Sequence, residues 1–336
     1  MAVLSLGDLE DLAAGVLSAS KTSSENAAIA AAALVRADAD GISSHGVDRL
    51  PVYSDQALGG KVDGFAEPEI TETGSAALHV DGRFGFAYPA VALGLGRAAE
   101  IARETGVAAV AVGNSSHAGV LGHHAEDMAD RGLAAMAFTN TPAAIAPWGG
   151  NRPLYGTNPV AFACPRLDAP PLVIDLSLSG IARGKIKLAA DRGEPLPEGL
   201  ATDAGGAPTT DAQAAMDGGS LLPIGGAKGA ALALMVEIMA AAMTGSQFGF
   251  EASSFFDAEG PPSGTGQFFF VFRPESLGGD GFADRLEVLL GAASEQPGAR
   301  LPGDKRLANR KKAEKEGVEV PDDLLQELRK RAAAHQ

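Results

Sequence analysis

The sequence contains little cysteine, few aromatic residues and fewer basic than acidic side chains. Its single cysteine, Cys164, excludes an internal disulfide framework and a cysteine-based zinc site. Aromatic residues make up only 5% of the 336 residues, but 46% hydrophobic residues overall suffice for a sizeable core and make global disorder an unsuitable description. A formal net charge of −15 argues against a nucleic-acid-binding protein, because phosphate contacts require clustered Lys and Arg.

Long apolar runs are also missing. The most apolar stretch, residues 229–245, is interrupted by Glu237 and is shorter than the ~20 residues that a membrane span needs. The first twelve residues, MAVLSLGDLEDL, have no basic segment and do not resemble a signal peptide. We therefore expect a cytoplasmic α/β protein with neither a membrane nor a nucleic acid as its partner.

The basic residues gather near the C-terminal end. Residues 301–336 contain nine Lys/Arg and seven Asp/Glu, so this segment is slightly positive although the whole chain is acidic. Two hypotheses fit. The segment is a solvated, salt-bridged tail, or Lys305 and Arg306, which follow Gly303 closely, face a phosphate.

The periodicity predicts helices in the first 60 residues, where Thr22 and Glu25 fit a capping box. Pro51 either begins a helix or kinks one that starts near His45. From about residue 70, strands and helices alternate, which is typical of an α/β or split α+β sheet. The predicted strands are 76–81, 107–114, 133–140, 160–165, 172–177 and 267–272. The predicted helices are 87–106, 120–132, 282–295 and 321–333, and residues 191–222 are predicted to be a surface loop.

Neither standard nucleotide-binding loop is present. The near-match to the dinucleotide fingerprint, Gly94-x-Gly96-x-x-Ala99, lies inside a helical pattern, whereas the fingerprint works at a strand-to-helix turn. A better anion site is the segment 223–229, PIGGAKG, because its glycines let the backbone approach a ligand and an apolar helix follows. Lys228 adds a full positive charge. The alternative is an ordinary glycine-rich turn that begins a buried helix.

Two histidines, His45 and His117, are candidates for proton transfer. Each follows a serine in a polar loop that contains glycine, and a hydroxyl neighbour can orient an imidazole that titrates near neutral pH. If residues 45–49 are helical, Arg49 lies one turn from His45, and its planar guanidinium suits a carboxylate. Reduction of a 2-oxo or 2-imino acid needs such a proton donor and carboxylate clamp. Hydrogen-bonded loop histidines are the alternative.

Two other chemistries fit the residues less well. A Ser-His-Asp hydrolase is disfavoured because Ser44 and His45 are adjacent and no G-x-S-x-G elbow occurs, so Ser44 is better interpreted as orienting His45. A metal-dependent lyase would use His117, His123 and His124, but no carboxylate or cysteine completes that ligand set. We therefore expect no metal.

Several ordered motifs together resemble the malate/L-lactate dehydrogenase family that lacks the usual Rossmann fold. They are ADADGISSHGVDRLPVY, GNSSHAGVLGHHAEDMA, YGTNPVAFACP with LVIDLSLS, LLPIGGAKGAAL and RLPGD. Within that family, NTPAAIAPWGG and SLSGIARGKI are most similar to the Δ1-piperideine-2-carboxylate/Δ1-pyrroline-2-carboxylate reductases. The resemblance implies a homodimer and an α/β (α+β) fold, with a mixed, largely antiparallel sheet in a non-Rossmann NAD(P)-binding domain. We assign residues 73–281 to that domain, and residues 1–72 and 282–336 to a helical domain with the substrate and dimer contacts.

The resemblance also implies roles for individual residues. His45 is similar to the family's proton donor, with Ser44 beside it and Asp191 as its candidate acidic partner. Substrate contacts are expected from Arg49, Tyr53 and Thr157. The stretches that resemble cofactor-binding segments comprise His117, Ala118, Gly119, Val120, Leu121, Asp175, Leu176, Ser177, Lys228, Gly229, Gly303, Asp304, Lys305 and Arg306.

The resulting hypothesis is an NAD(P)H-dependent reductase of small cyclic 2-imino acids that yields L-pipecolate or L-proline. The alternatives are a 2-hydroxy-acid dehydrogenase of the malate, L-lactate, ureidoglycolate or sulfolactate type, and a non-catalytic oligomeric binding protein. The basic run Arg183, Lys185, Lys187 and Arg192 favours NADPH over NADH, because it offers charge to a 2′-phosphate; solvated surface charge is an equal alternative.

Overall fold

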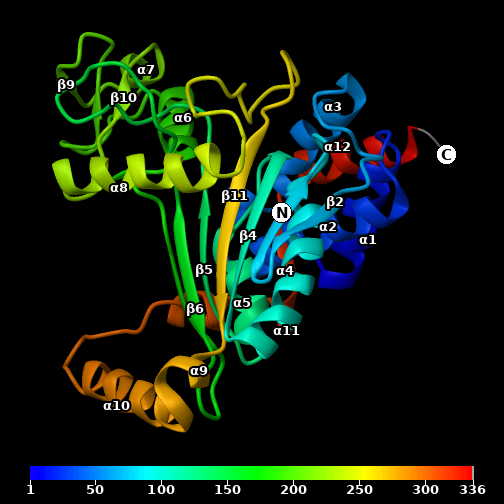
Figure 1. The fold of residues 1–336 in the computed structure, drawn as a ribbon. Helices are drawn as coiled ribbons and strands as arrows, with labels where there is room; N and C mark the ends of the chain where they lie inside the picture. Colours follow the sequence, from blue (N-terminus) through cyan, green and yellow to red (C-terminus); the bar gives the residue numbers. More distant parts are fainter. Residues whose placement is uncertain (335–336) are drawn as a thin grey trace.

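A seven-stranded sheet, in the order β2-β3-β4-β11-β5-β6-β7, forms the centre of the computed structural model, which describes residues 1–334 (Figure 1). Its strands are β2 (Glu69–Gly74), β3 (Ala77–Asp81), β4 (Val107–Ser115), β5 (Ala134–Thr139), β6 (Val160–Cys164), β7 (Leu172–Leu176) and β11 (Thr265–Phe272). Neighbours are antiparallel except β3 and β4. The expected mixed, largely antiparallel sheet is confirmed.

Helices cover both faces of this sheet. On one face, α4 (Ala87–Thr105) and α5 (Leu121–Ala129) pack on the apolar side chains of β3, β4 and β5. On the other, α8 (Ala227–Glu237) and the π-helix Ile238–Ala242 cover β5 and β11. Gly94 lies mid-α4, where a Cβ would come 2.8 Å from Val110. Close helix–sheet packing, rather than nucleotide binding, therefore explains that glycine.

The two ends of the chain pack together. Helices α1 (Leu6–Ser18), α2 (Ser24–Ala39), α3 (Leu50–Gly59) and α12 (Asp322–Ala333) share one core, and β1 (Ala2–Leu4) pairs with β12 (Val318–Val320). Ser23, not Thr22, caps α2: its side chain accepts from the Asn26 amide. Pro51 lies in the first turn of α3, and His45 and Arg49 lie in the preceding 3₁₀ turns Ser43–His45 and Val47–Arg49.

The segment after β11 takes a different position. Helices α9 (Pro274–Gly278) and α10 (Phe282–Ser294) lie at the far end of the sheet from α1 and α12 (Figure 1). Leu290 of α10 packs in one cluster with Cys164 and Leu172. Burial raises the pKa of the Cys164 thiol to about 11, so it stays protonated at neutral pH. The proposed boundary at residue 282, which groups α10 with the terminal helices, stays a prediction.

Several elements escaped the sequence patterns. The predicted loop 191–222 contains α7 (Ala212–Met216) and a small sheet of β8 (Ala201–Thr202), β9 (Pro208–Thr209) and β10 (Ser220–Leu221). Strand β2 was missed because it is an exposed edge with polar residues. Helices α6 (Arg183–Arg192) and α11 (Asp304–Glu316) were missed because they lack an apolar stripe. None of the helices in residues 1–334 has the length and hydrophobicity to span a membrane.

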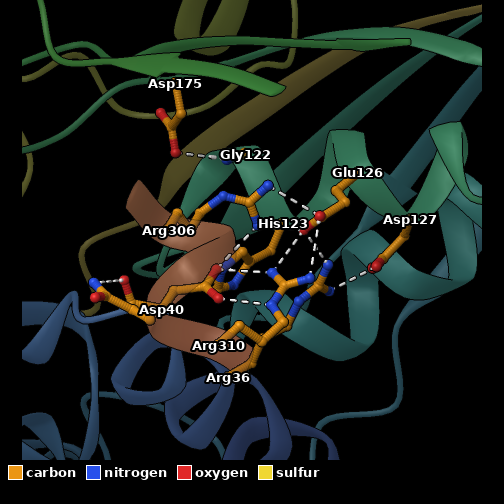
Figure 2. A network of polar contacts seen from close by, with 10 residues as sticks. Arg36, Asp40, Gly122, His123, Glu126, Asp127, Asp175, Arg306 and Arg310 are labelled. Carbon is orange, nitrogen blue, oxygen red and sulfur yellow. Dashed lines mark hydrogen bonds and ion pairs between the residues drawn. The ribbon is translucent and has the colours of Figure 1, made fainter. Parts of the chain in front are cut away.

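Helix α11 is held to the rest of the protein by ion pairs and not by an apolar face. Arg306 and Arg310 both contact the carboxylates of Asp40 and Glu126, whose side chains are 0% and 2% exposed (Figure 2). Arg36 of α2 also donates to Glu126, at 2.7 Å. We name these five residues the arginine–carboxylate network. It joins α2, α5 and α11, so the basic C-terminal segment is in part a buried anchor and not a solvated tail.

We predict that Glu126→Gln destabilises the fold by about 3 kcal/mol, because it removes the buried carboxylate that Arg36, Arg306 and Arg310 share. Burial alone would raise the pKa of Glu126, but hydrogen bonds from Arg306 and Arg310 outweigh it and lower the pKa from 4.5 to about 2. The stability difference from the unaltered protein should therefore be full above about pH 5 and shrink between pH 4.5 and 2. Urea unfolding at a series of pH values measures it.

Glu316→Gln is the matched control, because its ion pair with Lys312 is exposed on the surface. That change should shift the free energy of unfolding by less than about 0.5 kcal/mol. Equal effects of the two substitutions would contradict the assignment of Glu126 as a buried anchor.

Candidate active site

The turn that carries His45 is held from three sides. Ser44 Oγ lies 3.0 Å from His45 Nδ1, and Arg49 Nε donates to the Ser44 carbonyl at 2.8 Å. The Asp38 carboxylate accepts the Val47 amide at 2.7 Å, and burial raises the pKa of Asp38 to about 7. A Cβ on the intervening Gly46 would collide with that carboxylate. The sequence Ser44-His45-Gly46 thus places an imidazole and a guanidinium on one rigid turn.

His117 meets His45 from the end of β4. Their ring centroids are 5.3 Å apart. Tyr53, on α3, places its hydroxyl 2.7 Å from His117 Nδ1 and 3.2 Å from the Tyr88 hydroxyl. Phe255 also contacts His117, with 5.1 Å between ring centroids. The structure therefore brings together predicted residues that are 72 positions apart, and we call His45, Arg49, Tyr53 and His117 the histidine cluster.

The electrostatics of the cluster favour neutral imidazoles. Burial, assisted by the positive charge of Arg49, lowers the pKa of His45 to about 4. The same causes bring the pKa of His117 well below its ordinary value. Within residues 1–334 no carboxylate hydrogen-bonds to either ring and none forms an ion pair with Arg49, so the Arg49 charge has no direct partner. Both rings are therefore uncharged at pH 7 when no ligand is bound.

Arg49 is oriented but keeps binding capacity. Its guanidinium carbon lies 4.6 Å from the centroid of the Phe256 ring, and its Nε is engaged by the Ser44 carbonyl. In the described part of the chain its two Nη groups have no hydrogen-bond partner and no carboxylate pairs with it. Two parallel N–H groups in one plane are the donors that bind a carboxylate bidentately.

The predicted cofactor stretches converge at the N-termini of two helices. The loop His117–Leu121 leads into α5, where the Gly122 amide donates to Asp175 at 2.8 Å. Asp175 ends β7, and desolvation raises its pKa to about 6. Gly303, which begins α11, is close to the same strand, since a Cβ there would lie 3.5 Å from the Val173 carbonyl. Gly119 has φ +65° and would crowd Tyr88 with any side chain.

The Lys228 segment lies next to these stretches. The Ile224 amide donates to the Leu178 carbonyl at 2.9 Å, which ties residues 223–229 to the end of β7. Lys228 is exposed in the first turn of α8, and a Cβ on Gly229 would collide with the Ile224 carbonyl. Ser177 Oγ contacts Ser179 Oγ at 2.7 Å. Backbone amides, glycines and a lysine at one edge fit a phosphate-bearing cofactor.

Other predicted residues are engaged elsewhere. Asp191 is on α6, where it pairs with Lys187 at 2.8 Å, and it makes no contact with His45. Arg306 belongs to the arginine–carboxylate network, whereas Lys305 is exposed and Asp304 accepts the Leu301 amide. Thr157 is held by Thr141, its amide donating to Thr141 Oγ1 at 2.9 Å, and it makes no contact with the histidine cluster.

Three residues of the surroundings were not found from the sequence. Phe255 and Phe256 reach the cluster from a segment about 200 positions away, so no local pattern marks them. Glu237, 3% exposed, accepts the Gly156 and Gly249 amides and so orders the loop that carries Thr157. Its one signal is a lone charge inside the apolar stretch 229–245. Among the described residues, no group of three or more His, Cys, Asp or Glu side chains could hold a metal ion.

Comparisons with known proteins show the family of the chain. A family model described as malate/L-lactate dehydrogenase matches residues 4–329. The chain is 50% identical to a (2R)-3-sulfolactate dehydrogenase (NADP(+)) of Chromohalobacter salexigens, over 97% of each chain. It is 41% identical to a Δ1-pyrroline-2-carboxylate/Δ1-piperideine-2-carboxylate reductase of Pseudomonas putida, over 87% of this chain and 86% of that one.

Similar solved structures include enzymes named for the same two activities. The Δ1-piperideine-2-carboxylate reductase of Pseudomonas syringae pvar. tomato superposes with a TM-score of 0.93 at 37% identity, covering 98% of this chain and 100% of that one. The sulfolactate dehydrogenase of Methanocaldococcus jannaschii superposes with a TM-score of 0.90 at 30% identity, covering 98% and 96%.

We predict that Arg49→Met raises the pKa of both cluster histidines, because it removes the positive charge that disfavours their protonated forms. His45 should titrate near pH 4 in the unaltered protein and closer to its ordinary value of 6.5 in the variant. NMR titration of the histidine ring signals measures both values. Arg83→Met, which removes an exposed partner of Glu69, is the control and should leave them unchanged.

Proposed function

Because the chain belongs to the malate/L-lactate dehydrogenase family, we propose that it interconverts a small 2-hydroxy acid and its 2-oxo acid at the histidine cluster, with NADP(H) as cofactor. That it is an NAD(P)-dependent oxidoreductase follows from the family and its relatives. The observation that carries the finer proposal is the neutral His45 fixed beside an Arg49 with free Nη groups. The predicted NADPH agrees with the NADP(+) named for the 50% identical relative.

The residues at the converging helix N-termini fit a dinucleotide. Residues 117–121 and 175–177 would hold it close to the histidine cluster, and the two exposed lysines among the predicted cofactor residues, Lys228 and Lys305, would face its phosphates. When bound, the cofactor supplies or accepts the hydride. Every other requirement, namely holding the acid and moving a proton, falls to the protein.

Arg49 and His45 divide that task. The two Nη groups of Arg49 bind the substrate carboxylate, and His45 faces the oxygen at C2. In the oxidative direction, neutral His45 accepts the hydroxyl proton as a general base. In the reductive direction it must carry a proton, and substrate binding promotes this. A bound carboxylate offsets the Arg49 charge that lowers the pKa of His45, so the pKa rises when the acid is in place.

The charge of the cluster favours an oxo acid over an iminium. A cyclic imino acid that binds in its protonated form brings a second cation next to Arg49, and no carboxylate of the described residues contacts the histidines to balance it. A 2-oxo acid adds only negative charge. The 50% identical relative supports the same order, because its name gives a 2-hydroxy acid, (2R)-3-sulfolactate, as the substrate.

The cyclic imino acid is the second candidate. The reductases at 41% identity and at a TM-score of 0.93 support it. A specific observation also favours it: Phe255 and Phe256 present apolar rings beside His117 and Arg49, and ring methylenes pack well on such surfaces.

A second copy of the chain is the proposed macromolecular partner. Between Lys228 and Glu251 the only charged residue is Glu237, which is buried. Beyond its first turn, the exposed face of α8 and of the π-helix is therefore apolar, with Leu232, Met235, Ile238 and Met243 between 39% and 54% exposed. For a chain of net charge −15, an uncharged helix face is the surface on which two copies associate without repulsion. The homodimer and the cytoplasmic location stay predictions.

We predict that His45→Ala lowers turnover by about 10²–10⁴-fold, the usual contribution of a positioned acid or base. NADPH binding, followed by nicotinamide fluorescence, should stay nearly unchanged. His79→Ala, on β3 and bonded to the Thr244 carbonyl, is the control.

The unaltered enzyme should oxidise NADPH faster with 3-sulfopyruvate, oxaloacetate or pyruvate than with Δ1-piperideine-2-carboxylate. The opposite order would make the imino acid the substrate, and absence of NADPH binding would refute both functions.

We predict that Met235→Glu shifts the protein from a dimer to a monomer of 34.0 kDa, because it places a charge on the apolar α8 face. Light scattering after size-exclusion chromatography measures the mass. Leu277→Glu adds the same charge at a residue on α9 that is 79% exposed, and it should leave the dimer intact. A monomer before any substitution, or dissociation by both variants alike, would count against this face.

A further inference from the structure

The loop of residues 253–261 is fastened to α3 by a buried lysine. Lys61, with a side chain 2% exposed, directs its ammonium to Asp257 Oδ1 at 2.8 Å, to the Glu259 carbonyl at 2.6 Å and to the Asp257 carbonyl at 3.2 Å. All three acceptors belong to this loop. Gln56 of α3 adds a fourth bond, to the Asp257 carbonyl at 2.9 Å. A fully desolvated ammonium needs such a set of acceptors, so the loop and Lys61 hold each other in place.

The loop is also closed on itself. Ser253 Oγ donates to the Pro261 carbonyl at 2.7 Å, and the Phe256 amide donates to Ser254 Oγ at 3.0 Å. The Glu259 amide donates to Asp257 Oδ1 at 3.2 Å. Phe255 and Phe256 therefore project from a loop whose backbone is held by internal hydrogen bonds.

One face of α3 connects this loop to the histidine cluster. Arg49, Tyr53 and Gln56 follow at spacings of four and three, so they project from the same side of the helix. Arg49 meets the Phe256 ring, Tyr53 meets His117, and Gln56 meets Asp257. Phe255 also contacts His117. The loop therefore contacts two members of the histidine cluster, Arg49 and His117, and also Gln56 of α3.

We propose that the 253–261 loop is the specificity-determining wall of the substrate site: Phe256 fixes the plane of the Arg49 guanidinium, Phe255 limits the space beside His117, and Lys61 is the positioning residue that holds both rings. The proposal rests on the proposed function, because it takes Arg49 as the carboxylate-binding residue. With Nε bonded to Ser44 and its central carbon 4.6 Å from the centroid of the Phe256 ring, the guanidinium keeps its Nη edge for a ligand. The substituent at C3 of the acid must then fit beside the two rings.

The first test uses Phe256→Ala. Loss of the ring should raise KM for the preferred acid about tenfold, because Arg49 is no longer held in its binding orientation. The kcat should change less than threefold, and the dissociation constant of NADPH should not change. Phe256→Tyr keeps an aromatic face and should restore KM. Phe250→Ala, which removes an exposed ring stacked on Phe248, is the control.

The second test uses the lysine. Lys61→Met should reproduce the KM increase of Phe256→Ala without touching any proposed substrate contact. Because a buried position is altered, Asp257→Asn, whose side chain is about half exposed, is made in parallel and should give a smaller increase in the same direction. Lys21→Met is the matched control, since Lys21 donates to the Leu58 carbonyl of α3 but to no residue of the loop.

The third test measures the size limit. Phe255→Ala should increase the ratio of kcat/KM for phenylpyruvate to that for pyruvate at least tenfold, because space opens beside His117. An unchanged ratio, together with an unchanged KM in Phe256→Ala and Lys61→Met, overturns the proposal. A parallel loss of NADPH affinity in these variants also overturns it, because the loop would then serve general stability alone.

NMR separates failure of this inference from failure of the proposed function. Without its ring partner in Phe256→Ala, Arg49 moves away from the histidines, so the pKa of His45 should rise in the free protein, where no turnover is needed. A rise in an enzyme that reduces none of the acids refutes the function but supports the fixing of Arg49 by Phe256. No rise in an enzyme that does reduce them refutes the role of Phe256.

Discussion

Two buried carboxylates, Asp40 and Glu126, hold the architecture together. They accept from arginines of α2 and α11 while belonging to α2 and α5 themselves, so one charge cluster joins the N-terminal helices, the sheet and the C-terminal segment (Figure 2). Neither carboxylate tolerates the loss of its partners, because an unpaired charge at that depth costs several kcal/mol. Since α5 begins at the predicted cofactor loop, the same cluster sets where His117 and Gly122 stand relative to the turn that carries His45.

Four of the 27 basic residues are held in buried structural contacts. Arg36, Arg306 and Arg310 are paired in the network and Lys61 is enclosed by the 253–261 loop, which leaves Arg49 as the cation whose donors remain free within the histidine cluster. Burial, assisted by the Arg49 charge, keeps both imidazoles neutral, and the Nη groups of Arg49 are available to bind an anion. Binding of the acid therefore supplies the missing charge and, in the same step, makes protonation of His45 easier.

Local sequence patterns predicted the elements that neighbouring residues determine. They failed for elements whose position depends on contacts with residues far away in the sequence. The alternation of strands and helices foretold the central sheet, and Ser44-His45 with Arg49 was recognisable because one turn contains all three. Helix α11 was missed because its buried face is charged, so its partners, 180 or more positions away, are invisible to hydrophobic periodicity. Asp191 was a candidate partner of His45 from the resemblance alone, and in the structure it pairs with Lys187 on α6. The roles of the cofactor residues stay predictions.

In the histidine cluster, electrostatic repulsion disfavours an imino acid and apolar packing favours it. The two free energies are similar in size, which is consistent with relatives named for oxo-acid and for imino-acid chemistry. Two like charges about 4 Å apart near a protein surface repel by about 4 kcal/mol, which disfavours an iminium beside Arg49. Burying the four methylenes of a six-membered imino acid against Phe255 and Phe256 returns up to about 3 kcal/mol, at about 0.8 kcal/mol each. Because the two contributions are nearly equal, we expect one carboxylate near His45 or one altered ring in the 253–261 loop to shift the preference between oxo acids and imino acids.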